Sequence, residues 1–291
     1  MSWLKCLCVL LMFSPFIALA ADPVRIIPPQ SGFDASHDYF HKLIQLALSK
    51  STSLNPSEKA PDVIFTYPME QGRALMELKS GKDIDIYWAG TTPKRENDLI
   101  AIKIPLVKGL LGYRIPIILE GEEKKFEQVE DIHSLAKLTA CQGAHWPDSV
   151  ILETAGIRVF RNSIYEHLFD MLNAGRCDYF PRGIHEGIAE VEARAERLPH
   201  LRIYESLLIY YPFPMYYFVS QNNPILAERL RKGLEMTIDD GSFDHHLRYH
   251  PATKHLFPLD KWFSRRVIKI DNPLLPEGVD INNPRYWIIP N

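Results

Sequence analysis

The sequence lacks the features that mark several large classes of protein. It has no basic excess, since 33 Lys and Arg residues stand against 36 Asp and Glu residues and the formal net charge is −3. A protein that binds nucleic acid usually carries a basic surface, so we expect no nucleic acid partner. Beyond the first twenty residues, no run is long and apolar enough to span a bilayer.

Catalytic signatures are missing as well. The chain contains no G-x-S-x-G turn, no phosphate-binding P-loop and no H-E-x-x-H helix. Serine, histidine and aspartate are plentiful, but no spacing among them singles out a catalytic triad. We therefore predict no catalytic residue, no cofactor and no enzymatic activity.

Cysteine is scarce, and two of the four cysteines lie in a segment that we expect to be removed. Lys5 precedes the short apolar run CLCVLLMF, Pro15 interrupts the apolar segment, and the small residues ALA end at Ala20. This order is typical of a secretory signal peptide at residues 1–20, cleaved before Ala21. An uncleaved membrane anchor is the alternative. The sequence thus predicts an exported, periplasmic protein.

The mature chain keeps Cys141 and Cys177, each in a strand-like segment. An oxidising compartment permits a disulfide between them, provided that neighbouring strands bring their Cα atoms close enough. Otherwise the two residues are buried thiols that pack as small apolar side chains. Both alternatives stay open from the sequence.

Strand-like and helix-like patterns alternate in two halves of the chain. In the first half, Phe40, Leu43, Ile44, Ala47 and Leu48 recur at helical spacing. The repeated order β-α-β-α-β predicts parallel sheets covered by helices. Strands are expected at VRII (24–27), DVIFTY (62–67), DIDIYWAG (83–90), KLTACQG (137–143), IRVF (157–160) and CDYF (177–180).

Two local signals stand out in the second half. Ser163 and Glu166 have the spacing of an S-x-x-E capping box at the start of a helix that Gly175 ends. Pro181 follows the last strand and is expected to stop it, which leaves Arg182 in a loop.

Two extended stretches, residues 104–121 and 207–220, interrupt the alternation. We interpret them as crossings between two α/β lobes, with hinges at Gly109–Gly112 and Tyr211–Pro214. Ligands of parallel α/β sheets bind outside the carboxyl ends of the strands, so we expect a ligand cleft between the lobes. The tail from Pro251 is predicted to pack as an irregular strap. The predicted first lobe comprises residues 21–110 plus 214–291, and the second comprises residues 111–213.

The order and spacing of three segments resemble a known family. The segments are YWAGTTPKREN (87–97), LFDMLNAGRCDYF (168–180) and NNPILAERLRKGLEMTIDDGSFDHHLRYH (222–250). They are similar to segments of bacterial periplasmic solute-binding proteins of the polar amino acid type, family 3. The resemblance implies a type 2 periplasmic binding protein-like fold, in which each lobe has a mixed, mainly parallel sheet with helices on both faces. It also implies a non-catalytic protein of the ABC transporter type that closes on a small molecule.

The resemblance implies ligand contacts around the Thr-Pro turn of the first lobe. In the family, the Arg of this turn holds a ligand carboxylate, and Arg95 matches it. A planar guanidinium group suits that task because it donates two parallel hydrogen bonds. The alternative is a surface arginine paired with Glu96 or Asp98. Further ligand contacts are expected from Tyr67, Trp88, Gly90, Thr91 and Thr92.

The family's Gly-Thr-Thr turn in the second lobe corresponds to Gly143, Ala144 and His145, which Trp146 follows. The hydroxyl groups are gone, but backbone N–H groups at the start of the next helix would still bind an anion. We expect Gly143, His145 and Trp146 to contact the ligand, and core packing is the alternative for Trp146.

Relatives commonly place an Asp five residues after the strand Asp, where it pairs with the ligand's ammonium group. Counted from Asp178, that position is Gly183, so the acid is missing and Arg182 stands beside it. Arg95 and Arg182 facing each other across a cleft predict a small, anionic or carboxylate-bearing ligand. The alternative is that Arg182 pairs with Glu186 or with the strand Asp.

Two other interpretations concern metal and partner. His245, His246, His250 and His255 lie in one segment, where an i,i+4 pair suits a metal; solvated surface histidines are the alternative, and we predict no metal site. The fold of the family serves both transport and ligand sensing. The expected partner, beside the small-molecule ligand, is therefore a membrane permease or a receptor.

Overall fold

The computed structural model describes residues 22–52 and 59–289. The predicted signal peptide, residues 1–20, lies outside the described residues. Within those two ranges, no helix combines the length and the apolar character needed to cross a membrane.

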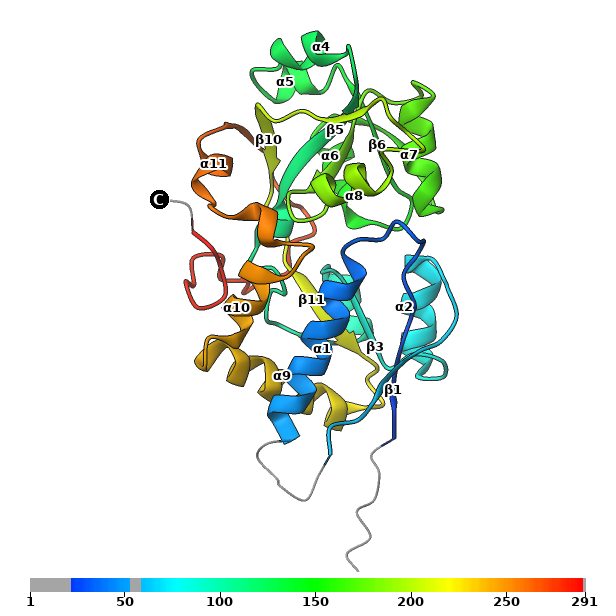
Figure 1. Cartoon of the computed structure of the whole chain (residues 1–291), viewed down its shortest axis with the longest axis vertical. Coiled ribbons are helices and arrows are strands. Elements are labelled where there is room, and N and C mark those ends of the chain that lie inside the picture. Colours follow the sequence, from blue (N-terminus) through cyan, green and yellow to red (C-terminus); the bar gives the residue numbers. More distant parts are fainter. Residues whose placement is uncertain (1–21, 53–58, 290–291) are drawn as a thin grey trace, which may run out of the picture.

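The chain folds into two α/β lobes, which Figure 1 shows one above the other. The first lobe, the lower one in the view, contains β1 (Val24–Ile26), α1 (His37–Thr52), β2 (Val63–Phe65), α2 (Gln71–Ser80), β3 (Ile86–Gly90), α3 (Pro93–Asp98), β4 (Ile100–Ile102), β11 (Met215–Val219), α9 (Pro224–Asp239) and α10 (Ser242–Tyr249). Strands β1 and β2 pair in parallel, whereas β11 lies antiparallel between β3 and β4.

The second lobe again combines parallel and antiparallel strands. It contains β5 (Tyr113–Leu119), α4 (Glu123–Glu127), α5 (Ile132–Leu135), β6 (Thr139–Gly143), α6 (Pro147–Thr154), β7 (Arg158–Asn162), α7 (Tyr165–Asn173), β8 (Phe180–Gly183), α8 (Gly187–Ala193), β9 (Leu201–Ile203) and β10 (Leu207–Tyr210). Strands β6 and β7 pair in parallel, and β5 pairs antiparallel with β8, β9 and β10.

Helix α1 packs on α9 along the apolar face that its sequence predicted. Phe40, Leu43, Ile44, Ala47 and Leu48 are all buried, and each large side chain of this kind stabilises the fold by about 1.5–3 kcal/mol. The two helices approach so closely that a Cβ atom at Gly233 would lie 1.9 Å from the Ala47 carbonyl oxygen. Only glycine fits at this contact.

Strand β8 differs from its prediction. It does not stop at Pro181 but runs from Phe180 to Gly183, so Arg182 lies within the strand. Pro181 faces Pro116 of β5 in the antiparallel register. A proline is tolerated where the ladder needs no N–H donor from it, and this pairing sets one proline against the other.

The predicted capping box at the start of α7 is wrong. The side chain at the N-cap position, Ile164, forms no capping hydrogen bond. Glu166 instead lies beside Arg194, with a second contact of 2.8 Å from its Oε2 to Arg197 Nη2. The Glu166 carboxylate therefore pairs with the buried Arg194 guanidinium and does not cap the helix.

The two crossings between the lobes run side by side. The backbone N–H of Tyr211 donates to the Gly112 carbonyl at 3.2 Å, and Tyr113 pairs with Tyr210 in the adjoining sheet. Gly109 has a φ of +80°, and a Cβ atom there would lie 2.1 Å from the Trp287 ring. Glycine therefore permits both the backbone turn and the close approach of the tail.

The tail crosses this hinge as a strap. It begins with η2 (Lys254–Leu256), α11 (Asp260–Phe263) and β12 (Arg266–Lys269). Strand β12 pairs in parallel with β10, so part of the range predicted for the first lobe adds a strand to the second lobe's sheet. Farther on, Asn272 Nδ2 donates to the Pro212 carbonyl at 2.8 Å and the Ile288 N–H to the Lys108 carbonyl at 3.0 Å.

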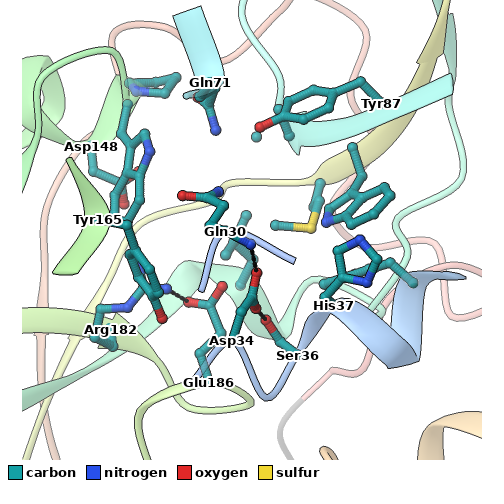
Figure 2. A pocket seen from close by; sticks show the side chains of 18 of the residues that line it. Gln30, Asp34, Ser36, His37, Gln71, Tyr87, Asp148, Tyr165, Arg182 and Glu186 are labelled. Atoms are coloured by element: carbon teal, nitrogen blue, oxygen red, sulfur yellow. Dashed lines mark hydrogen bonds and ion pairs between the residues drawn. The ribbon is translucent and has the colours of Figure 1, made fainter. Parts of the chain in front are cut away.

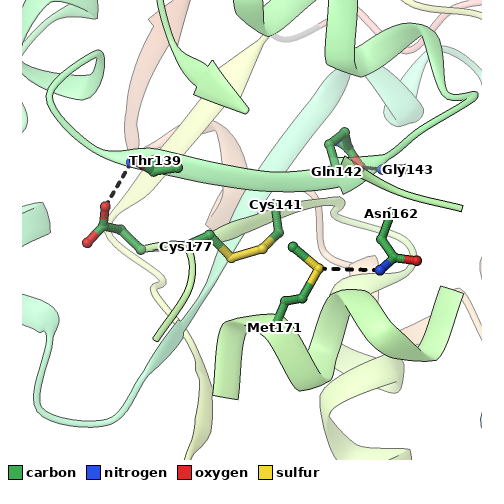
Figure 3. Close-up of a disulfide and its surroundings, with 8 residues drawn as sticks. Thr139, Cys141, Gln142, Gly143, Asn162, Met171 and Cys177 are labelled. Carbon is green, nitrogen blue, oxygen red and sulfur yellow. Dashed lines mark hydrogen bonds between the residues drawn. A yellow bond between two sulfur atoms is a disulfide. The ribbon is translucent and has the colours of Figure 1, made fainter. Parts of the chain in front are cut away.

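Cys141 and Cys177 are joined in a disulfide, with their Cα atoms 5.6 Å apart. Figure 3 shows the bond linking β6 to the segment that leads into β8. The Asp178 carboxylate accepts the Thr139 N–H at 2.8 Å beside it. Of the two alternatives that the sequence left open, the structure has the disulfide.

Candidate functional site

A small cavity of about 90 Å³ lies between the lobes, and side chains of both lobes line it. Figure 2 shows these side chains pointing toward one another from the two sides. We use two names for its sides. The first-lobe wall comprises Asp34, His37, Phe40, Tyr87 and Trp88, and the second-lobe wall comprises Arg114, Asp148, Tyr165, Arg182 and Glu186.

Aromatic rings make up most of the first-lobe wall. The Trp88 ring stacks on Phe40, with centroids 5.4 Å apart, and on Tyr87, with centroids 6.0 Å apart. His37 meets the Trp88 ring edge-on at 5.1 Å, and its Nε2 atom lies 2.9 Å from the Ile27 carbonyl oxygen. The wall is thus a set of mutually supported rings with fixed orientations.

Asp34 is the carboxylate of the first-lobe wall. It accepts the backbone N–H of Gln30 at 3.1 Å and the Ser36 hydroxyl at 3.3 Å, both drawn in Figure 2. No Lys or Arg of the described residues forms an ion pair with it. Burial raises the pKa of Asp34, because the charged carboxylate loses its water, and the nearby Glu190 raises it further.

The second-lobe wall is built on paired charges. Arg182 donates from Nε and Nη2 to the two carboxylate oxygens of Glu190 at 2.8 and 2.7 Å, and its Nη2 lies 3.1 Å from Glu186. The Tyr165 hydroxyl donates to Glu190 at 2.5 Å. Burial alone would lower the pKa of Arg182, but Glu186 and Glu190 hold it well above its usual range. The guanidinium carbon of Arg182 lies over one face of the Trp146 ring, 4.7 Å from the ring centroid.

A second buried ion pair continues the same wall. Arg114 Nη2 lies 2.5 Å from Asp148 Oδ1, and the Tyr211 hydroxyl bridges the two side chains. Glu186 lies 3.7 Å from Arg114 as well as against Arg182, so it connects both pairs. In a buried network of this kind, each charge depends on the others for compensation.

Gly183 has no side chain to offer a ligand, yet an acid occupies the space beside it. Glu186 Oε2 accepts the Gly183 N–H at 3.1 Å and would lie 3.0 Å from a Cβ atom at that position. The inference that this side of the cleft presents a cation and no anion is therefore wrong. Three residues further along the chain, Glu186 supplies the missing carboxylate.

Arg95 lies beside the cavity and forms no ion pair with a described carboxylate. Its guanidinium donates to the Gly90 carbonyl, to Gln71 Oε1 at 2.6 Å and to the His145 carbonyl at 2.9 Å. Burial lowers the pKa of Arg95 to about 10. Because His145 belongs to the second lobe, Arg95 ties the two lobes together at the edge of the cavity.

Other contacts close the gap between the lobes elsewhere. Ser31 Oγ donates to Glu166 at 2.7 Å, and Arg194 reaches the Phe33 carbonyl at 3.4 Å. His145 Nε2 lies 3.8 Å from Glu70. The structure thus has the lobes in contact around the cavity.

The predicted ligand contacts fall into two groups. Trp88, Gly90, Trp146 and Arg182 line the cavity. The other predicted residues do not line it. One of these, Thr92, caps α3 by accepting the Arg95 N–H.

The remaining predicted residues lie behind the cavity or outside it. Thr91 Oγ1 donates to Glu96 at 2.9 Å, and Gly143 lies against the Trp146 ring, which a Cβ atom there would meet at 2.3 Å. Tyr67 is exposed, and its hydroxyl donates to Asp83 at 2.5 Å.

The histidine segment is tied into the protein by its own hydrogen bonds. Within the described part of the chain, no group of three or more His, Cys, Asp or Glu side chains is arranged to hold a metal ion. The ring nitrogens lie close to protein oxygens: His246 to the Tyr39 carbonyl at 3.0 Å, His250 to Asp38 at 3.2 Å and His255 to the Ile184 carbonyl at 3.1 Å.

Sequence reasoning missed three charged groups that line the cavity, namely Asp34, Arg114 and Asp148, and also Glu190, which holds Arg182 from behind. Arg114 did carry a signal, since a charge within the apolar strand YRIPIIL requires a buried partner. Asp34 lies shortly before α1, and Asp148 lies in the first turn of α6. An acid at the start of a helix is common for local reasons, so nothing in the sequence around either residue indicates a cavity.

Comparison with known proteins supports the fold. No protein-family model and no curated protein matches the sequence. An ancestral arginine-binding protein bound to arginine is 19% identical, with a TM-score of 0.56 over 84% of this chain and 99% of its own. An arginine-specific periplasmic binding protein from Salmonella typhimurium is 13% identical, with a TM-score of 0.58 over 78% and 98%. A histidine kinase sensor domain similar to periplasmic binding proteins is 16% identical, with a TM-score of 0.54 over 78% and 95%. These likenesses confirm the two-lobed, type 2 periplasmic binding protein-like fold.

Proposed function

We propose that this chain is a periplasmic solute-binding protein that captures a small molecule between its lobes and delivers it to a membrane partner. The supporting observation is the cavity between the lobes, whose two walls come from different lobes. A ligand that touches both walls favours the closed arrangement over an open one, so binding and lobe closure are coupled. The amino acid-binding proteins with the same fold support a small-molecule role without catalysis.

The cavity limits the size of the solute. Its volume of about 90 Å³ is smaller than the roughly 150 Å³ of an engineered cavity that holds benzene. A ligand of arginine's size does not fit the closed arrangement. The proposed ligand therefore has only a few non-hydrogen atoms.

A molecule with a carboxylate group is one candidate for this small ligand, and the contacts of Arg95 favour it. This guanidinium has only neutral oxygens as partners, so exchange of one of them for a ligand carboxylate would add a charge-assisted bond. Arg182 favours it less, because Glu190 and Glu186 already neutralise that cation.

The experiment is a thermal-shift screen of the mature protein against small amines, amino acids, carboxylic acids and sugars. A ligand at about one hundred times its dissociation constant stabilises the folded protein by about 2.7 kcal/mol. Trp88→Ala, which removes the central ring of the first-lobe wall, should abolish the shift. Tyr249→Ala, at an exposed aromatic residue, should leave it unchanged.

Two results would contradict the proposal. One is that no small molecule shifts the wild-type midpoint. The other is a shift that Trp88→Ala leaves intact, since the ligand would then bind elsewhere. In the proposal the membrane partner is a permease or a receptor, and cross-linking in cells with and without ligand would identify it.

A further inference from the structure

We propose that the solute is a small organic ammonium ion, held by the Asp34 carboxylate against the aromatic rings of the first-lobe wall. The inference rests on the proposed function and concerns the same cavity. It departs from the acidic ligand that the sequence predicted.

The charges around the cavity favour a cationic ligand. Three carboxylates line it, those of Asp34, Asp148 and Glu186, against the two guanidinium groups of Arg114 and Arg182. Behind them, Glu190 and Arg95 are of opposite sign. Arg194 and Glu166 form an ion pair of their own, so these groups leave the excess unchanged. Enclosing an uncompensated negative charge is costly, and a monovalent cation removes that cost.

The carboxylates differ in how much binding capacity they retain. Asp148 and Glu186 each lie against a guanidinium group. Asp34 accepts only one backbone N–H and one hydroxyl, while an ionised carboxylate has about four acceptor sites. An ammonium group placed at Asp34 would therefore gain an ion pair without breaking one.

The rings of the first-lobe wall suit the same charge. A cation over a Trp or Tyr face gains about 0.5–2 kcal/mol, and more when water is excluded. Trp146, in the opposite lobe, already carries the Arg182 guanidinium on one face. The Phe40, Tyr87 and Trp88 rings bear no such cation among the described contacts, so this side of the cavity is the one that a ligand cation would occupy.

Size excludes a ligand with two well-separated charged ends. A cavity of about 90 Å³ holds fewer atoms than benzene has. The class that fits is an amine or a methylated ammonium ion of roughly four heavy atoms.

The test is a calorimetric titration of the mature protein with compounds of matched size and different charge. The series is ethanolammonium and trimethylammonium as cations, ethylene glycol as the neutral analogue, acetate as the anion and glycine as the zwitterion. All titrations are made at one pH, so that His37, which also acts on Asp34, is in the same state for every compound. We expect the cations to bind at least tenfold more tightly than the other compounds.

Two variants locate the charge. Asp34→Asn keeps the shape but removes the carboxylate, and should weaken cation binding at least tenfold. Asp62→Asn makes the same change of net charge at an exposed position and should have no effect. The wild-type series is informative even where Asp34→Asn fails to fold.

Preferential binding of acetate or glycine would overturn the inference and leave the proposed function intact. Equal binding of ethylene glycol and ethanolammonium would also overturn it, because charge would then not matter. If these compounds and the wider screen of amino acids, acids and sugars all fail to bind, the proposed function fails together with it.

Discussion

The two walls of the cavity are built on different principles. The second-lobe wall is a closed network, in which Arg182 and Arg114 each have acidic partners within the protein. The first-lobe wall has stacked rings and Asp34, a carboxylate that no described cation neutralises. In the proposed function, the second-lobe wall is therefore a surface whose charges are already paired, while the first-lobe wall provides the groups that bind the ligand.

Breaking the second-lobe network should have the largest effect. Glu190→Ala removes the carboxylate that holds Arg182 at two points. Removal of one partner of a buried ion pair costs about 3–5 kcal/mol of stability, which urea denaturation would measure. Glu192→Ala changes an exposed acid on the same helix and should cost less than about 0.5 kcal/mol. Equal losses in the two variants would show that the network is not what stabilises this wall.

The disulfide supports the same lobe and should come next in size. It closes a loop with a sequence separation of 36 residues, for which a loss of about 2–4 kcal/mol is typical. The double variant Cys141→Ser, Cys177→Ser should show this loss in urea denaturation. A reducing agent should destabilise the wild-type protein and leave the variant unchanged; any further loss in the variant would point to another cause.

Arg95 joins the two lobes through the His145 carbonyl, and its removal tests whether lobe closure depends on that contact. Arg95→Gln loses a charged donor to the His145 carbonyl, a bond worth about 1.5–3 kcal/mol. Ligand affinity should fall about tenfold, and small-angle scattering should show a larger radius of gyration. Lys94→Gln removes a neighbouring exposed charge and is the control. An unchanged affinity in Arg95→Gln would remove Arg95 from both the closure and the ligand site.

Asp34 should give the smallest change in stability, and in the opposite direction. Its pKa is raised in the folded state, so folding binds protons and the stability due to this group falls as pH rises above its ordinary value of 3.8. Asp34→Asn should therefore stabilise the ligand-free protein by about 1 kcal/mol at neutral pH.

The pH dependence separates this effect from a general one. The difference in melting temperature between Asp34→Asn and wild type should grow as pH rises from about 4 toward neutrality. His37 and Glu190, the other titratable groups that bear on Asp34, are present in both proteins and largely cancel. A variant that is less stable than wild type at every pH would mean that Asp34 has a structural role.

The sequence predicted the scaffold better than the site, because the two depend on different distances along the chain. Helix α1 and the turn at Gly175 follow from local periodicity and from one backbone conformation. The sequence predicted that the strand ends before Pro181, whereas β8 continues past it. A proline is tolerated there because it faces Pro116, which lies far away in the chain.

The charge of the site was misjudged for a similar reason. The sequence left open whether Arg182 faces a ligand or pairs with Glu186, and the structure has the pair with Glu186, together with a second partner, Glu190. Whether Glu186 and Glu190 reach it depends on the turn from β8 into α8, which a family pattern five residues long does not describe. Comparison with that pattern correctly identified the missing acid at Gly183, but not the acid that replaces it.

The strap across the hinge is made from the last part of the chain, with Ile288 bonded to Lys108 and Trp287 against Gly109. Synthesis from the N-terminus produces these residues after those of both lobes. Since domains generally fold as units once their residues are available, each lobe can form its core before the strap reaches the crossings. The order of synthesis therefore leaves the relative position of the lobes as the last feature of the molecule to be established.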